Sequence, residues 1–330
     1  MNLMEFNQSD RCVNFSCPER SVSPAVYILL YVCSAAVVLL TVCGNLLVII
    51  SVSHFKQLHT PTNTLVFSLA VSDFLVGIFV MPPMFSWAIE TCWIFGRDFC
   101  SVFWLITCFI TNVSIYNIAL IAVDRYLALS NPFLYMNHVS VRIICVVIVF
   151  DWGVVMVYNL ALIYFNGNFT SSLMCPGESY LFLNEVWTVI DLVITFIFPL
   201  SVIIILYTHV FLIAKKHTTA IRELNNHTRP ETQKITSHST KSDRKAAKVL
   251  GILVSVFLIC LLPFFIYNLL GYVIELQAET LQKLSILFCL NSTINPVIYA
   301  LFYPWFRRCF KLSITLQIFQ NDSTLINVLS

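Results

Sequence analysis

The side chain with the clearest chemical potential is Asp191, a carboxylate inside an apolar run that extends from Trp187 past Pro199. Placing an unpaired charge in apolar surroundings costs several kcal/mol, so an ionisable residue in such a run marks a candidate functional site. A nearby opposite charge favours the ionised form of a carboxylate. We therefore expect Asp191 to bind a cation, provided that the run crosses a membrane.

The composition predicts that the apolar run around Asp191 crosses a membrane. The chain is 58% hydrophobic and 11% charged, with a mean hydropathy of +0.82, whereas soluble domains contain about 25% charged residues. A membrane-spanning helix needs roughly 20 mostly apolar residues, while spanning strands are shorter and alternate in polarity. We expect an all-α membrane protein with seven spans, at about 24–52, 63–88, 98–128, 142–165, 185–213, 246–273 and 281–303.

The basic residues predict how these spans are oriented, because Lys and Arg gather on the cytoplasmic side. With the N-terminus outside the cell, all 19 Lys and Arg except Arg11, Arg20, Arg97 and Lys283 fall inside. This topology gives an extracellular tail (1–23), a seven-transmembrane domain (24–303) with a third cytoplasmic loop at about 214–245, and a cytoplasmic tail (304–330).

Two further features fit this topology. N-glycosylation sequons fall outside the cell at Asn7, Asn14 and Asn168. Inside, the stretch from Phe302 to Leu312 mixes aromatic and basic residues and predicts a short amphipathic helix at the membrane surface, in which Cys309 is a candidate for palmitoylation.

The distribution of polar residues argues against two other classes of membrane protein. An intramembrane enzyme is disfavoured because the spans contain no Ser/His pair and no His-rich metal set, and the seven His residues lie in loops or near helix ends. A transporter or channel would need internal repeats with broken helices, or polar residues across the whole bilayer. We find no such repeat, and the polar residues cluster in two layers, around Asp191 and around Asp73.

A set of short motifs follows the spans in order. The motifs are Gly44-Asn45, Leu69-Ala70-Val71-Ser72-Asp73, Asp124-Arg125-Tyr126, Trp152, Pro199 with Tyr207, Phe257 with Pro263, and Asn295-Pro296-Val297-Ile298-Tyr299. Each motif alone is weak, but the ordered set covers essentially the whole chain and resembles the rhodopsin-like G-protein-coupled receptors. The resemblance implies a seven-helix receptor that passes its signal to a heterotrimeric G protein.

A narrower resemblance is to the trace-amine-associated receptors, and within them to the fish branch. It is carried by four segments: His54–Asn63, Arg244–Lys248, Asn291–Pro296 and Leu301–Arg307. Most members of that family are olfactory receptors for volatile amines, so the resemblance implies a small amine as ligand.

The resemblance also implies roles for groups of residues. Cys100 would form a disulfide with Cys175. G-protein coupling and activation would depend on Asp124, Arg125, Tyr126, Tyr207, Asp243 and Tyr299. A packing switch below the pocket would consist of Ile115, Pro199 and Phe257. A sodium site would consist of Asp73, Ser114, Asn291, Ser292 and Asn295, with a neutral, hydrogen-bonded Asp73 as the alternative.

The chain departs from the amine-receptor pattern at the usual ammonium anchor. Such receptors generally carry an aspartate in the third span, at the position of Thr107. One branch of the fish receptors instead has its aspartate in the fifth span, where this chain has Asp191, eight residues before Pro199. We predict that Asp191 binds the ammonium group. The alternative is a neutral Asp191 that forms a hydrogen bond with Asn112 or Thr111.

The predicted ligand pocket surrounds this carboxylate. Its members are Asp191, Thr107, Cys108, Thr111, Asn112, Trp187, Thr188, Phe264, Phe265 and Asn268. Trp187 lies one turn from Asp191 and would add a cation–π contact. One deep carboxylate predicts that a monoamine suffices, while Glu185, more than a turn above, leaves room for the second charge of a diamine.

The sequence therefore predicts a non-enzymatic plasma-membrane receptor for small volatile amines, olfactory and coupled to a stimulatory G protein that raises cAMP. The alternatives are a neuromodulatory biogenic-amine receptor and a non-amine odorant receptor. Its partners would be the amine, the G protein and the lipid bilayer, without nucleic acid, and Na⁺ would be the only bound ion, with no cofactor.

Overall fold

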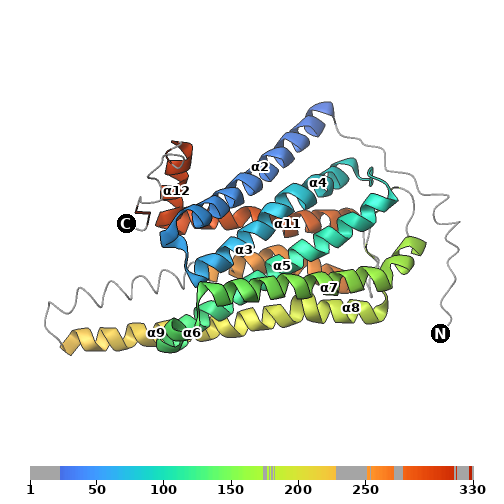
Figure 1. Ribbon diagram of the computed structural model, residues 1–330. Coiled ribbons are helices and arrows are strands. Elements are labelled where there is room, and N and C mark those ends of the chain that lie inside the picture. The colour runs from blue at the N-terminus through green and yellow to red at the C-terminus, as the bar shows by residue number, and fades with distance from the viewer. Residues whose placement is uncertain are drawn as a thin grey trace.

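Helices form nearly all of the part of the chain that can be described. The computed structural model describes residues 23–173, 177, 179, 181, 183–227, 251–252, 254–270, 278–315, 317 and 327–328. Figure 1 shows long helices that run side by side as a bundle. The elements are α2 (Pro24–His54), η1 (Lys56–Leu58), α3 (Pro61–Leu75), η2 (Val76–Val80), α4 (Met81–Glu90), α5 (Arg97–Ser130), α6 (Pro132–His138), α7 (Val141–Leu173), α8 (Glu185–Asp191), η3 (Leu192–Ile197), α9 (Phe198–His227), α11 (Ala278–Phe302) and α12 (Pro304–Ile314).

The predicted spans match these helices. Six helical stretches are long and apolar enough to cross a membrane: Pro24–His54, Pro61–Glu90, Arg97–Ser130, Val141–Asn166, Glu185–Ile213 and Glu279–Phe302. The sixth predicted span corresponds to the shorter apolar helix Val254–Leu270, and the rest of that predicted range lies largely outside the described residues. The all-α, seven-helix architecture predicted from the sequence is therefore confirmed.

Local capping explains where several helices begin. Ser23, Thr60 and Asn131 each accept a hydrogen bond from a backbone N–H in the first turn of α2, α3 and α6, and each precedes a proline. Proline suits the first helical position because the N–H that it lacks would have no partner there. Sequence alone thus determines these boundaries.

The second and fifth spans each contain a π-helical segment next to proline. η2 directly precedes Met81-Pro82-Pro83, and η3 ends two residues before Pro199. A proline has no N–H to donate to the carbonyl four residues earlier, so the regular hydrogen-bond ladder is interrupted there. The fifth span consequently changes register directly after Asp191.

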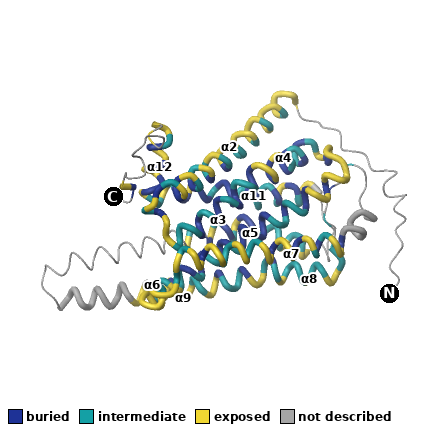
Figure 2. The backbone as a smooth tube through the Cα atoms, in the orientation of Figure 1, coloured by how far each residue is buried: buried dark blue, intermediate teal, exposed yellow. Residues whose placement is uncertain are grey.

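α5 is the centre of the bundle and packs against α3, α7 and α9. Figure 2 shows the buried residues facing the interior, while much of the outer surface of α2 and α7 is exposed. Large apolar side chains cover this outer surface, including Val149 and Phe150 on α7. An apolar exterior is what a lipid-facing helix requires.

The last helix, α12, packs against the ends of α2 and α11. It buries Trp305, Phe306, Cys309 and Leu312 and exposes Arg308, so the predicted amphipathic helix is confirmed. The Cys309 thiol is fully buried. Palmitoylation of Cys309 would therefore require α12 to leave this contact.

Candidate functional site

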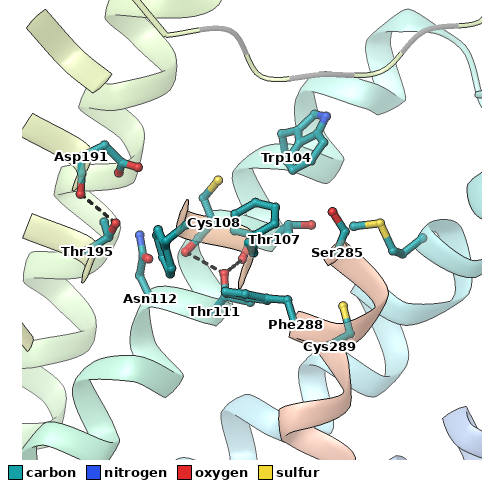
Figure 3. A pocket seen from close by; sticks show the side chains of 13 residues that line it. Trp104, Thr107, Cys108, Thr111, Asn112, Asp191, Thr195, Ser285, Phe288 and Cys289 are labelled. Carbon is teal, nitrogen blue, oxygen red and sulfur yellow. Dashed lines mark hydrogen bonds between the residues drawn. The ribbon is translucent and has the colours of Figure 1, made fainter. Parts of the chain in front are cut away.

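A cavity of about 80 Å³ lies between α5, η3, α11 and the helix Val254–Leu270 (Figure 3). Seven of the ten predicted pocket residues line it: Asp191, Thr107, Cys108, Thr111, Asn112, Phe264 and Phe265. Six lining residues were not predicted: Met84, Trp104, Thr195, Ser285, Phe288 and Cys289. Asp191 is the charged member of this set, and within the described residues no group of His, Cys, Asp and Glu side chains could hold a metal ion.

Asp191 is half-buried at the end of α8 and has a partner that the sequence did not suggest. The Tyr158 hydroxyl on α7 donates a hydrogen bond to Asp191 Oδ1 at 2.8 Å. The two alternative partners, Asn112 and Thr111, donate elsewhere: Asn112 to Asn159 Oδ1 at 3.3 Å, and Thr111 to the Thr107 carbonyl. The side-chain partner of Asp191 in the structure is thus Tyr158. Tyr158 and Asp191 are 33 positions apart, so only the packing of α7 against the fifth span reveals their contact.

The π-helical segment η3 sets the direction of Asp191. In an α-helix, the eight residues from Asp191 to Pro199 turn through about 800° and leave the two side chains about 80° apart. A π turn takes in one extra residue, so the same eight residues turn about as far as seven, roughly 700°, and the difference falls to about 20°. Pro199 is buried, and Asp191 therefore comes close to the inward face of the span.

Two side-chain hydroxyls stabilise this register. Thr195 Oγ1 donates to the Asp191 carbonyl at 2.7 Å, and the Tyr116 hydroxyl of α5 donates to the Ile194 carbonyl at 2.7 Å. A π turn breaks the usual i to i+4 ladder, and carbonyls that lose a partner must be satisfied in another way. Tyr116 and Thr195 supply those partners, which anchors η3 to the third span.

Three predicted pocket residues do not line the cavity. The Trp187 ring stacks on Phe165 with centroids 5.4 Å apart, so it packs against α7. The Thr188 hydroxyl donates to the Asn184 carbonyl at 3.0 Å, and the Asn268 amide donates to the Phe264 carbonyl at 2.8 Å. The side chains of Thr188 and Asn268 therefore bond to backbone carbonyls of their own segments, and the Trp187 ring is covered by α7.

Phenylalanine rings form an apolar wall in the cavity. Phe265 lies beside Phe264 and Phe288, with centroids 5.7 and 6.1 Å away, and Phe264 lies 5.2 Å from Phe288. Phe196 of η3 stacks on Phe265 at 4.3 Å, outside the lining itself. The wall connects the carboxylate side of the cavity to the seventh span, and it favours apolar ligand surface.

A second polar layer gathers around Asp73, which is fully buried. Ser114 and Ser292 donate to Oδ1 at 3.1 and 2.8 Å, and Asn295 donates to Oδ2 at 2.7 Å. Asn291, the fifth predicted member of the sodium site, is buried one turn before Asn295. The structure thus brings α3, α5 and α11, which are the second, third and seventh spans, together at one carboxylate.

A third polar cluster surrounds Asp124, near the end of α5. Arg125 pairs with Asp124 Oδ2 at 2.5 Å, Thr62 donates to the same oxygen at 2.8 Å, and Tyr135 of α6 donates to Oδ1 at 2.6 Å. Burial, followed by the hydrogen bond and charge of Asp124, raises the pKa of Tyr135 above its ordinary value, so this phenol keeps its proton. Asp124 therefore restrains both the Arg125 guanidinium and the helix that follows α5.

The remaining predicted activation residues lie within the bundle where they are described. Tyr299 is buried, Tyr207 is half-buried, and the Tyr126 ring makes an edge contact with His209. Ile115, Pro199 and Phe257, the predicted packing switch, are all buried, and Ile115 and Phe257 belong to one apolar core. Asp243 lies outside the described residues.

The predicted disulfide and glycosylation sites are mostly beyond what the structure describes. Cys100 is buried at the start of α5, and the Ser179 hydroxyl donates to its sulfur, but Cys175 lies outside the described residues. Cys92 is disulfide-bonded. Asn7 and Asn14 are also outside the described residues, as is the side chain of Asn168.

Comparison with known proteins identifies the family. Residues 44–299 match the family described as 7 transmembrane receptor (rhodopsin family). Trace amine-associated receptor 13c of Danio rerio is 37% identical over 339 aligned positions, which cover 99% of this chain and 98% of that protein. The chain belongs to the trace amine-associated receptors. Trace amine-associated receptor 1 of Homo sapiens is 37% identical over 94% of this chain and 95% of its own length, and receptor 4 of Mus musculus is 35% identical over 94% and 92%.

Membership of this family decides the broad class of the protein. It is a G-protein-coupled receptor and not an enzyme. Receptors of this family bind small ligands, couple to G proteins and cross the plasma membrane several times.

Proposed function

We propose that this trace amine-associated receptor is activated by small volatile amines and that Asp191 binds their ammonium group. The observation that carries the proposal is that Asp191 supplies the negative charge of the cavity lining, while Thr107, at the usual anchor position in the third span, is neutral. An ammonium group in this pocket therefore has one carboxylate to approach.

Rough magnitudes support a small ligand. An ammonium about 4 Å from Asp191 gains about 4 kcal/mol at an effective dielectric constant near 20. Micromolar binding requires about 8 kcal/mol. At about 25 cal/mol per Å² of apolar surface, the other half needs roughly 160 Å². The phenylalanine wall offers surface of this kind, so an amine with a short alkyl or aryl group is sufficient.

We further propose an olfactory role and coupling to a stimulatory G protein, as the resemblance to the fish branch implies. The N-terminus would be extracellular, Cys100 would pair with Cys175, and Asn7, Asn14 and Asn168 would carry glycans. The charge distribution and the sequons support this topology.

A panel of alkyl and aryl amines tests these proposals together. Cells that express the receptor with an N-terminal epitope should stain without permeabilisation and raise cAMP in response to some of the amines. Neutral isosteres of the active amines should have no effect. A calcium response without cAMP would contradict the coupling, and activation by the neutral isosteres would favour the non-amine odorant receptor.

Sodium is the second proposed ligand, at Asp73. The Ser114 and Ser292 hydroxyls can rotate to offer lone pairs, and with the carboxylate they form the oxygen-rich set that a hard cation prefers. A cation bound here would stabilise the resting arrangement of the second, third and seventh spans. Replacing sodium with N-methylglucamine should therefore lower the EC50 of an activating amine severalfold.

In the Asp73→Asn variant, this sodium effect should be absent, because the charge that attracts the cation is gone. Dose–response curves in both buffers measure it as a ratio of EC50 values. A variant that kept the ratio of the parent receptor would show that Asp73 is a neutral structural group.

Tyr158 is expected to assist Asp191. Its hydroxyl donates to Oδ1 and leaves the other oxygen available to the ligand. Hydrogen bonds to charged groups contribute about 1.5–3 kcal/mol, so Tyr158→Phe should raise the EC50 of an activating amine about tenfold or more. Dose–response curves at matched surface expression give the value. A lower EC50 would instead mean that Tyr158 competes with the ammonium group.

A further inference from the structure

Thr107 presents a buried hydroxyl that has no partner. The residue is 7% exposed and lines the cavity, and its Oγ1 makes no hydrogen bond within the described part of the chain. Its neighbours differ: the Thr111 hydroxyl donates to the Thr107 carbonyl, and the Ser285 hydroxyl donates to the Leu281 carbonyl at 2.8 Å. A buried polar group without a partner is unfavourable, so a ligand that supplies one gains affinity.

The position of Thr107 defines what that partner is. Figure 3 shows Thr107 and Ser285 well away from Asp191, on the side of the cavity formed by the third and seventh spans. The cavity residues near Thr107 and Ser285 are neutral, since Asp191 is the one charged residue among the described residues of the cavity lining. A second ammonium group there would be desolvated without a counter-ion, which is costly, whereas a hydroxyl or ether oxygen only needs a hydrogen bond.

We propose that Thr107 selects monoamines that carry a neutral hydrogen-bonding group at the end opposite the ammonium, such as linear amino alcohols. This inference rests on the proposed function, because it requires the ammonium at Asp191. The apolar middle of such a ligand lies along the phenylalanine wall, and its hydroxyl reaches Thr107 Oγ1. The receptor therefore prefers an amino alcohol to both the alkylamine and the diamine of the same length.

Three matched ligands test the inference: pentylamine, aminopentanol and diaminopentane, followed by the same sets from propyl to octyl. At the best chain length, the amino alcohol should have an EC50 about tenfold below that of the alkylamine, which corresponds to ~1.4 kcal/mol. The diamine should be the weakest of the three. Equal potency of amino alcohol and alkylamine at every length would overturn the inference.

Variants at Thr107 test whether its hydroxyl causes the preference for the amino alcohol. Thr107→Val keeps the shape and removes the hydroxyl, so the EC50 ratio of alkylamine to amino alcohol should fall from about ten to about one. Thr107→Ser retains the hydroxyl and should keep the ratio of the parent receptor. A ratio is used because a general effect of either variant on folding or expression cancels. An unchanged ratio in Thr107→Val would overturn the inference.

The outcomes separate this inference from the proposed function. If amines activate the receptor through Asp191 but Thr107→Val leaves the ratio unchanged, only the role of Thr107 fails. If no amine activates the receptor, the ammonium site and the role of Thr107 both fail. A diamine that activates best at every length would contradict the selection while leaving Asp191 as the anchor.

Discussion

Replacing Asp191 with asparagine is expected to raise the EC50 of an activating amine about a thousandfold, or to abolish the response within the usable concentration range. The variant loses the attraction between carboxylate and ammonium, about 4 kcal/mol at an effective dielectric constant near 20. Each 1.4 kcal/mol is about a factor of ten. Asparagine has nearly the same volume and can still accept the Tyr158 hydrogen bond, so the packing of the fifth span is preserved.

Asp151 supplies a matched control. It is another aspartate in a membrane-spanning helix, on α7, and it does not line the cavity. Asp151→Asn removes the same charge as Asp191→Asn but should leave the amine EC50 within about threefold, since Asp151 does not line the cavity that would hold the ammonium group. The measurement is cAMP against amine concentration at equal surface expression. Equal losses in both variants would mean that any charge removed from the bundle impairs the receptor, and the anchor assignment would fail.

The second large effect is expected from Asp124→Asn, which should raise basal cAMP about tenfold in the absence of ligand. In the structure, Asp124 holds Arg125 at 2.5 Å and also accepts hydrogen bonds from Thr62 and Tyr135. Hydrogen bonds to charged groups contribute about 1.5–3 kcal/mol. If about 1% of receptors are active at rest, a loss of ~1.4 kcal/mol from the resting state raises the active fraction about tenfold.

Removing the neighbouring hydroxyls one at a time should give smaller increases in basal cAMP. Thr62→Val and Tyr135→Phe each delete one bond to Asp124 while its charge stays next to Arg125, so each should raise basal cAMP less than Asp124→Asn does. Basal signalling is measured per receptor at the cell surface, because a loosened bundle often expresses less well. If basal signalling in Asp124→Asn equals that of the parent receptor, this cluster does not restrain the resting state.

The sequence predicts the helices and the position of Asp191 within one of them well, because the physics involved is local. An apolar run of sufficient length has to span the membrane, and a charge within it is too costly to be there without a use. Asp191 stands out on this ground, whereas the roles of Asp73 and Asp124 are implied by motifs that resemble the receptor family. Ser23 and Thr60 likewise mark the starts of α2 and α3, because each accepts a hydrogen bond from the backbone N–H three residues later.

What could not be predicted depends on how helices face each other. Tyr158 is far from Asp191 in sequence, and its contact depends on the rotation of α7. Trp187 is expected from the sequence to face the pocket beside Asp191, but its ring stacks on Phe165 of α7 and does not line the cavity. Phe288 completes the phenylalanine wall from the seventh span, although nothing in its own segment marks it as a ligand contact. The free hydroxyl of Thr107 emerges only once the partners of its neighbours are known.

The π turn at Leu192–Ile197 has a consequence for how such receptors diverge. It places one surplus residue between the acidic position and the proline that follows. Deleting a single codon in this segment would close the π turn into an ordinary α-helix, and the seven remaining steps to the proline would still turn through about 700°, so Asp191 would keep its direction. The direction of Asp191 in a lineage can therefore survive the loss of one residue from this segment, whereas a substitution of Asp191 itself would remove the charge. Alignments that count positions from Pro199 without allowing for the turn would assign the wrong face to the residues before it.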